Sequence, residues 1–267
     1  MPIISSKAVV HNPAGLADDV QVGPFTIIGP DVTVGAGTII HNAVTIVGRT
    51  RIGSKCQLFP GAVVGASPAG APEPAGPCRI GDRNIIREHV LIEAGLSPTG
   101  DGTIVGDDNL LMVGCQVAHD ARLDGEGIFA NFTRIAASAR IEPFVRTSGF
   151  TTISEYATVG AYAFTTGYAA VEIDAPPYCI VQGLPAIARS VNTENLRRCG
   201  FADESIAQIK EAFRAIFNGD SALPNPDRLA EAQERFRQEP VKTLVDFLLR
   251  TAASSAGRQR GPIGTLF

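Results

Sequence analysis

Residues 22–40 read VGPFTIIGPDVTVGAGTII, and an aliphatic side chain returns in this stretch at every sixth position. The same period extends from Val10 to Val64, then resumes from Ile80 to Ile92 and from Val105 to Val171. Only Thr147 and Thr165 interrupt it. Because a helix repeats every ~3.6 residues and a strand every two, neither element alone explains a period of six. The pattern predicts short strands joined by tight turns and stacked into a solenoid.

The positions next to the repeating residue fit the same solenoid. Glycine often follows it, as at Gly23, Gly35 and Gly53, and a small or β-branched residue usually stands four positions after it. We expect these glycines to supply backbone freedom in the turns. Three strands per coil give a triangular column, a mainly β fold in which the repeating side chain points at the axis. The repeat itself leaves the hand of the coil open.

Two segments break the repeat. Residues 66–79 and 94–103 are rich in proline, glycine and serine. Since proline lacks the backbone donor of a strand ladder, we expect loops extruded from the column. Such loops are either tolerated insertions at a corner or arms that line a site or reach a neighbouring molecule.

The repeat ends near Pro176 and Pro177, and helical spacing of apolar residues follows. We therefore expect a β-helix domain over residues 1–190 and an α-helical domain over residues 191–267. The first helix is expected to start at an Asp203 N-cap and to close at Gly219. Further helices are expected from Asp227 and from near Pro240, and the tail over residues 252–267 is expected to fray.

Composition excludes several classes of protein. The chain has 267 residues, of which 45% are hydrophobic and 19% charged, so it is not disordered. Its net charge of −4 argues against nucleic-acid binding, which needs a basic surface. It has no apolar run long enough to span a membrane and no basic leader, so we expect a cytoplasmic protein. Five cysteines without close spacing indicate neither disulfides nor a zinc site.

Four histidines are the candidate bases. His11, His41 and His89 stand at turn positions or beside charged residues, and we expect them to be solvated. His119 differs because Asp120 follows it, and a carboxylate can fix an imidazole tautomer and stabilise the imidazolium. Adjacent residues of a strand point to opposite faces, so this pairing requires a turn between them. With no second histidine at a suitable position, no metal is expected.

Six segments carry a resemblance to a known family. They are residues 80–87 (IGDRNIIR), 106–112 (GDDNLLM), 117–120 (VAHD), 176–178 (PPY), 182–183 (QG) and 192–201 (NTENLRRCGF). Over nearly the whole chain, the sequence resembles the UDP-N-acetylglucosamine O-acyltransferases of lipid A biosynthesis. The resemblance implies a left-handed parallel β-helix of hexapeptide repeats that forms a homotrimer, with active sites in clefts between columns. It also implies transfer of a 3-hydroxyacyl chain from acyl carrier protein to the 3-hydroxyl of the glucosamine, without a cofactor.

The resemblance also assigns roles to residues. His119 takes the family's general-base position and Asp120 that of its orienting partner. Ala137 stands where the family has a glycine whose backbone N–H steadies the carbonyl oxygen. Gly167 stands at the position that limits acyl length. The positions that contact the sugar nucleotide or the carrier's phosphopantetheine are occupied by Asn192, Glu194, Arg197 and Arg198.

Several positions depart from the family. Histidine or glutamine is replaced at four positions that we still expect to bind substrate, namely Gln116, Ser138, Ser154 and Glu155. Glu93-Ala94 replaces His-Arg, Leu184-Pro185 replaces Asn-His, and residues 66–79 lack the family's Asp-Leu-Lys. These changes leave three functions open. They are O-acyl transfer to UDP-N-acetylglucosamine, O- or N-acyl transfer to another sugar nucleotide, and binding of a sugar nucleotide or carrier without turnover.

Overall fold

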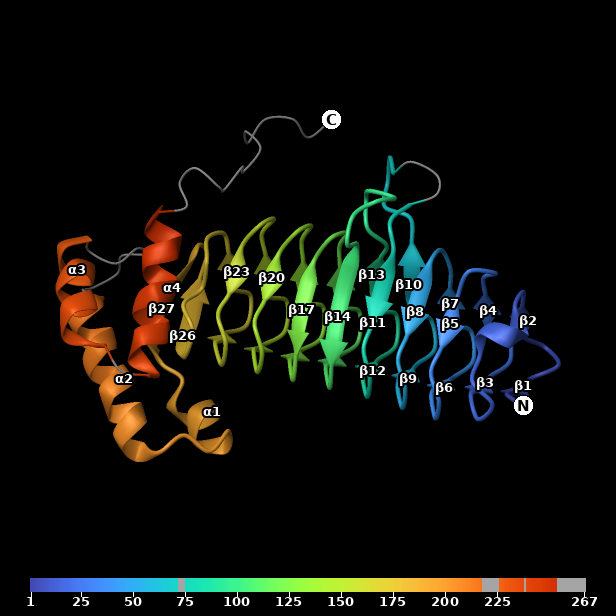
Figure 1. Cartoon of the computed structure of the whole chain (residues 1–267), viewed down its shortest axis with the longest axis horizontal. Coiled ribbons are helices and arrows are strands. Elements are labelled where there is room, and N and C mark those ends of the chain that lie inside the picture. The colour runs from blue at the N-terminus through green and yellow to red at the C-terminus, as the bar shows by residue number, and fades with distance from the viewer. Residues whose placement is uncertain (72–74, 218–225, 238, 254–267) are drawn as a thin grey trace.

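The chain winds as a left-handed parallel β-helix followed by a small helical part, as the resemblance implied. The computed structural model describes residues 1–71, 75–217, 226–237 and 239–253. Figure 1 shows a long column of short strands that runs from the N-terminus, with the helices gathered at its far end.

Three sheets form the sides of the column. Sheet A contains β1 (Ile3–Ile4), β3 (Gln21–Val22), β6 (Ile39–Ile40), β9 (Gln57–Leu58), β12 (Ile85–Ile86), β15 (Leu110–Leu111), β18 (Ile128–Phe129), β21 (Arg146–Thr147), β24 (Phe164–Thr165), β26 (Cys179–Gly183) and β27 (Ala186–Val191). Sheet B contains β2 (Val9–Val10), β4 (Ile27–Ile28), β7 (Thr45–Ile46), β10 (Val63–Ala66), β13 (Leu91–Glu93), β16 (Gln116–Val117), β19 (Arg134–Ile135), β22 (Thr152–Ile153) and β25 (Ala170–Val171). Sheet C contains β5 (Thr33–Val34), β8 (Thr50–Ile52), β11 (Cys78–Ile80), β14 (Thr103–Asp107), β17 (Arg122–Gly125), β20 (Arg140–Ile141) and β23 (Thr158–Val159).

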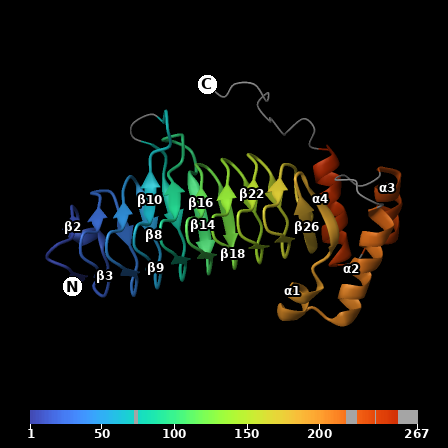
Figure 2. The same ribbon diagram turned by 180° about the vertical axis from the view of Figure 1, so that it is seen from behind.

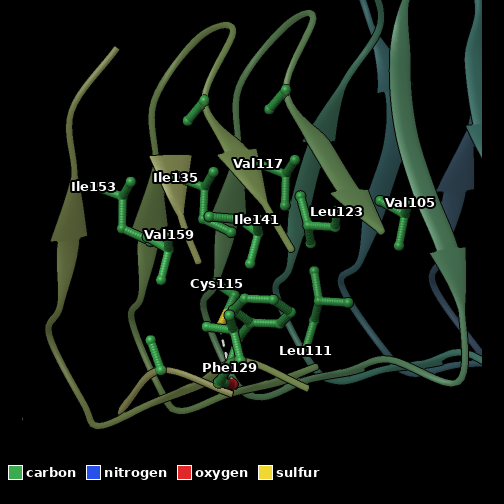
Figure 3. Packing of buried hydrophobic residues seen from close by; sticks show 14 of the residues in the cluster. Val105, Leu111, Cys115, Val117, Leu123, Phe129, Ile135, Ile141, Ile153 and Val159 are labelled. Carbon is green, nitrogen blue, oxygen red and sulfur yellow. Dashed lines mark hydrogen bonds between the residues drawn. The ribbon is translucent and has the colours of Figure 1, made fainter. Parts of the chain in front are cut away.

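The repeating side chains stack inside the column. Ile46 pairs with Val64, Val64 with Ile92, and Ile92 with Val117 in parallel register, and all four are buried. Figure 3 shows this interior around Leu111, Phe129 and their neighbours. Burial of one aliphatic side chain per strand supplies the stabilisation that a two-residue strand lacks on its own.

The two threonines that interrupt the repeat are buried as well. Thr147 Oγ1 accepts the Ala130 N–H at 3.0 Å and lies 2.7 Å from Thr133 Oγ1. One coil further along, Thr165 Oγ1 lies 2.9 Å from Thr151 Oγ1. The hydroxyls therefore satisfy one another, as buried polar groups must.

Gly65 follows a repeating residue and has φ of 80°, as expected for a turn, but two other glycines in this position have a different reason. Gly35 and Gly53 do not lie in the left-handed region. A Cβ on Gly35 would stand 2.7 Å from the carbonyl carbon of Gly53, and one on Gly53 would stand 2.5 Å from the oxygen of Gly81. Close approach of consecutive coils, rather than backbone freedom, selects glycine there.

Residues other than glycine occupy many of the left-handed corners, beside glycines such as Gly37 and Gly61. Phe132, Phe150 and Tyr168 all have φ near 59° and are exposed. Their rings stack, with centroids 5.2 Å apart for the first pair and 5.1 Å for the second. Contact between equivalent corners offsets the cost of this backbone conformation.

Two excursions leave the column at the corner between sheets B and C. The first runs between the end of β10 at Ala66 and the start of β11 at Cys78, and the second between the end of β13 and the start of β14. They project from the same edge (Figure 2), and the Gly76 N–H donates to the Gly95 carbonyl at 2.7 Å. Ala66, Cys78, Arg79 and Thr103 belong to strands, so both excursions are shorter than the sequence suggested.

The C-terminal part begins with a hairpin that the repeat did not predict, because β26 and β27 pair antiparallel. The helices described after it are α1 (Thr193–Arg198), α2 (Asp203–Ile216), α3 (Pro226–Arg235) and α4 (Val241–Ala253). Helix α1 was not expected. Asp203 is the first residue of α2 rather than its cap, which is Ala202, and Gly219 lies outside the described residues. Ala252 and Ala253 continue α4, so fraying from residue 252 was wrong for these two.

The helices pack on one another and on the column. The α2 side chains Ile206, Ile209 and Ile216 are buried, as are Leu244 and Leu248 of α4. No helix within the described residues is both long and apolar enough to cross a membrane.

Candidate active site

His119 and Asp120 form a hydrogen-bonded pair at the corner after β16. Asp120 has φ of 58°, so the chain turns between the two residues and both side chains face the same way. His119 Nδ1 lies 2.9 Å from Asp120 Oδ2. Because an ionised carboxylate only accepts hydrogen bonds, Nδ1 carries a hydrogen, and in the neutral imidazole Nε2 therefore has the free lone pair. This is the arrangement of a general base with an orienting carboxylate.

His119 lines a cavity of about 410 Å³ on the outer face of sheet B, whereas Asp120 stands behind the imidazole and does not line it. The end of β13, the strands β16, β19 and β22 and the corners after them form its walls. The cavity brings together five of the residues singled out from the sequence, namely Gln116, His119, Ala137, Ser154 and Glu155.

Ala137 has a free backbone donor beside this cavity. It does not adopt positive φ, so a Cβ is tolerated where the family has glycine. No acceptor for its N–H occurs among the described residues. Ser138 takes the left-handed position instead, with φ of 56°, and its N–H donates to the His119 carbonyl at 3.0 Å. Ser138 does not line the cavity.

The helix α1 residues lie elsewhere in the chain. Asn192, which precedes α1, is 6% exposed, and its side-chain Nδ2 donates to the Tyr162 carbonyl at 2.9 Å. The Asn192 side chain therefore holds the start of α1 against the column. Arg198 pairs with Glu194 at 3.0 Å, and Arg197 with Asp203 at 3.2 Å. None of these residues lines the His119 cavity of the same chain.

Gly167 also lies away from this cavity, at the corner between β24 and β25. A Cβ there would meet only Ser148 Oγ at 3.6 Å and the Gly149 oxygen at 3.7 Å, which are ordinary contacts. The fold therefore leaves room for a side chain at this position.

Sequence reasoning did not count two charged cavity residues among the site residues. Glu93 Oε2 accepts the backbone N–H of His119 at 3.0 Å. Arg134 stands on β19 between Gln116 and Thr152 in the sheet register and has no carboxylate partner among the described residues. Its position in the six-residue repeat could have identified Arg134 as a cavity residue, because the residue before each buried strand residue faces outside the column.

The other histidines and the cysteines do not compete with His119. His11 and His89 are exposed, as expected. His41 is half-buried rather than fully solvated: its Nε2 has no hydrogen-bond partner among the described residues, and its ring lies 4.6 Å from that of Phe59. Burial raises the pKa of the Cys115 thiol to about 11, which keeps it protonated. Among the described residues, no group of three or more potential ligands could hold a metal ion.

A left-handed parallel β-helix with a histidine–aspartate pair beside a free backbone donor defines a hexapeptide-repeat acyltransferase. A family model described as UDP N-acetylglucosamine O-acyltransferase, domain 2, matches residues 174–262. The acyl-[acyl-carrier-protein]–UDP-N-acetylglucosamine O-acyltransferase of Thermodesulfovibrio yellowstonii is 38% identical over 250 residues, which cover 92% of this chain and 95% of that protein. The chain belongs to the UDP-N-acetylglucosamine O-acyltransferase family.

Solved structures of the family superpose closely. The UDP-N-acetylglucosamine acyltransferase of Bacteroides fragilis gives a TM-score of 0.87 at 34% identity, covering 93% of this chain and 98% of that one. The corresponding protein of Acinetobacter baumannii gives a TM-score of 0.82 at 32% identity, covering 94% and 95%.

Proposed function

We propose that this protein transfers a 3-hydroxyacyl chain from acyl carrier protein to the 3-hydroxyl of UDP-N-acetylglucosamine. The observation that carries the proposal is that His119, held by its hydrogen bond to Asp120, lines the same cavity as Ala137, whose N–H has no acceptor among the described residues. The names of the relatives supply the donor and the acceptor.

The reaction follows from these groups. His119 Nε2 removes the proton of the acceptor hydroxyl while that oxygen attacks the thioester carbonyl carbon. As the new C–O bond forms, the carbonyl electron pair moves onto oxygen, where the Ala137 N–H stabilises the charge. The C–S bond then breaks, and the imidazolium returns its proton to the departing phosphopantetheine thiolate. Asp120 stabilises the imidazolium between these two steps.

Binding of the sugar nucleotide needs positive charge near the base. Arg134 lies in the cavity without a carboxylate partner among the described residues, and a guanidinium suits diphosphate oxygens. Gln116 and Ser154 line the same cavity and offer further hydrogen bonds.

We propose a homotrimer in which α1 of one subunit completes the cavity of the next. Asn192, Glu194, Arg197 and Arg198 do not line the cavity of their own chain, and the family positions that they occupy contact substrate. We place the reaction in the cytoplasm, as the sequence led us to expect.

Gly167 is proposed to set the length of the acyl chain. A Cβ at this position would meet nothing closer than 3.6 Å, so the space above the glycine accommodates the far end of a longer chain. A side chain at this position would shorten the space without straining the fold.

The proposal is tested by incubating the protein with 3-hydroxyacyl carrier proteins of several lengths and UDP-N-acetylglucosamine, and by detecting the ester by mass spectrometry. His119→Ala should abolish product formation, and His89→Ala, which changes an exposed histidine, should leave it intact. No ester from the wild-type protein with this panel, or full activity of His119→Ala, refutes the proposal.

One observation favours a second acceptor. Glu155 brings a carboxylate into the cavity where the family has glutamine, and a carboxylate favours a cationic ammonium over a hydroxyl. The alternative is N-acyl transfer to an amino-sugar nucleotide. Mild alkali separates the two products, because an ester is hydrolysed and an amide persists.

A further inference from the structure

The second excursion, residues 94–102, begins and ends beside the catalytic pair. Glu93, the last residue of β13, accepts the His119 N–H through Oε2 at 3.0 Å. Thr103, the first residue of β14, accepts the Asp120 N–H through Oγ1 at 2.9 Å. Both backbone donors of the pair are therefore held by the two ends of one excursion.

The excursion also holds the Asp120 carboxylate. The Leu96 N–H donates to Asp120 Oδ2 at 3.1 Å, and this is the oxygen that lies 2.9 Å from His119 Nδ1. A Cβ on Gly95 would stand 2.9 Å from Asp120 Oδ1 and 2.5 Å from the Gly102 Cα. The backbone of the excursion thus packs directly on the carboxylate, and a second donor fixes the oxygen that orients the imidazole.

The excursion is itself fastened to the column and to the first excursion. The Arg49 guanidinium donates to the Pro98 carbonyl at 2.6 Å and to the Ala75 carbonyl at 3.1 Å. The Gly95 N–H donates to the Pro77 carbonyl at 3.1 Å. Because both excursions share these bonds, the contacts to His119 and Asp120 come from a braced segment rather than from an isolated loop.

We propose that the excursion over residues 94–102 is a positioning device for the catalytic pair, with Glu93 and Thr103 as positioning residues. Its effect on rate rests on the function proposed above. Asp120 occupies a left-handed turn position at a corner of the column, where its side chain would otherwise sample other rotamers. The three bonds restrict the turn and the carboxylate together, so that Nδ1 stays protonated and Nε2 stays basic.

Four variants test the proposal with matched controls. Thr103→Val removes the acceptor of the Asp120 N–H while keeping the shape of a fully buried side chain, and Thr103→Ser restores the hydroxyl. Glu93→Ala removes the acceptor of the His119 N–H, and Glu93→Gln keeps an oxygen there without the charge. None of these side chains supplies the base or the proposed oxyanion donor.

Two readouts are measured on the full-length protein. Long-range ¹H–¹⁵N spectra report the tautomer of the His119 ring, which is assigned by comparison with His119→Gln. We expect a single Nδ1-protonated form in the wild type and in Thr103→Ser, and a mixture of tautomers in Thr103→Val and Glu93→Ala. The same two variants should lose about 10- to 100-fold in kcat, with KM unchanged for both substrates.

Wild-type ring spectra together with wild-type kcat in Thr103→Val and Glu93→Ala overturn the proposal. Failure of the wild-type protein to form any acylated product refutes the proposed function instead. The ring spectra still decide the positioning role in that case, because they need no substrate.

Discussion

The charge of Asp120 can be removed without changing its shape, by Asp120→Asn. The amide oxygen takes the place of Oδ2 and can still accept both the His119 Nδ1–H and the Leu96 N–H. The fold and the resting geometry should therefore persist. What is lost is the negative charge beside the imidazolium that, in the proposed mechanism, forms when His119 takes the acceptor proton.

The size of the loss follows from the geometry. Two unit charges 2.9 Å apart attract by about 1.4 kcal/mol in water and by about 6 kcal/mol at an effective dielectric constant of 20. The side chains of His119 and Asp120 are 28% and 30% exposed, so the site lies between these limits. An intermediate value of about 3 kcal/mol corresponds to a decrease in kcat of about 100-fold.

The assay is steady-state acyl transfer from 3-hydroxyacyl carrier protein at saturating sugar nucleotide, with thermal unfolding as the control for the fold. We expect kcat to fall while the melting temperature and the binding of the sugar nucleotide stay unchanged. A kcat equal to that of the wild type refutes the electrostatic role of Asp120. A melting temperature low enough to leave the variant unfolded under the assay conditions refutes the claim that Asp120→Asn preserves the fold.

Four other predictions concern the column and its surroundings. Thr147→Val leaves the buried Ala130 N–H without its acceptor, although the Thr133 hydroxyl still donates to the Ala130 carbonyl, and should lower the free energy of unfolding by about 1–3 kcal/mol. Thr147→Ser should not lower it, and denaturant titration measures both variants. Gly167→Met should shorten the longest acyl chain accepted without lowering the melting temperature, and unchanged chain selectivity contradicts the proposed role. Cys56, Cys78, Cys115 and Cys179 are buried, and burial raises the pKa of Cys78 to about 12, so a thiol reagent at pH 8 should label only Cys199 until the protein unfolds. The Arg83 guanidinium, 2.6 Å from the Asp108 carboxylate, holds the pKa of Asp108 below its usual value. The pair therefore stabilises the fold at pH values above the ordinary carboxyl pKa, and this stabilisation is lost as the pH falls through the lowered pKa of Asp108. Arg83→Gln should lower the melting temperature at pH 7 and have no effect at a pH where Asp108 is protonated.

The column was predictable because its determinant is local. The period of six needs only the sequence, and the side chains from Ile28 to Val171 that carry it are buried in the structure. The reason for the glycines was not predictable in the same way. Gly35 and Gly53 are excluded from carrying a Cβ by backbone in the following coil, and that contact appears only when the coils are stacked.

The site was predictable in part for the same reason. His119 and Asp120 are adjacent in sequence, so their pairing needed only a turn. Glu93 is 26 positions before His119, and an excursion lies between them whose length cannot be deduced from the six-residue repeat. No local pattern places a contact of that kind.

The position of His119 and Asp120 in the repeat is itself informative, because equivalent corners can be compared directly. In the next two coils, the residues at the position of Asp120 are Ser138 and Tyr156, and each donates its N–H to a backbone carbonyl of the preceding coil, that of His119 or Ala137. Asp120 cannot follow this rule, because the preceding coil has left the column there, and its N–H turns to the Thr103 hydroxyl instead. A uniform repeat offers each corner the same backbone partners and hence the same environment. The excursion breaks this uniformity, and the side chains of Glu93 and Thr103 then reach a corner that would otherwise be surrounded by backbone alone. The interruption of the repeat therefore gives this one corner side-chain partners that the equivalent corners at Ser138 and Tyr156 lack.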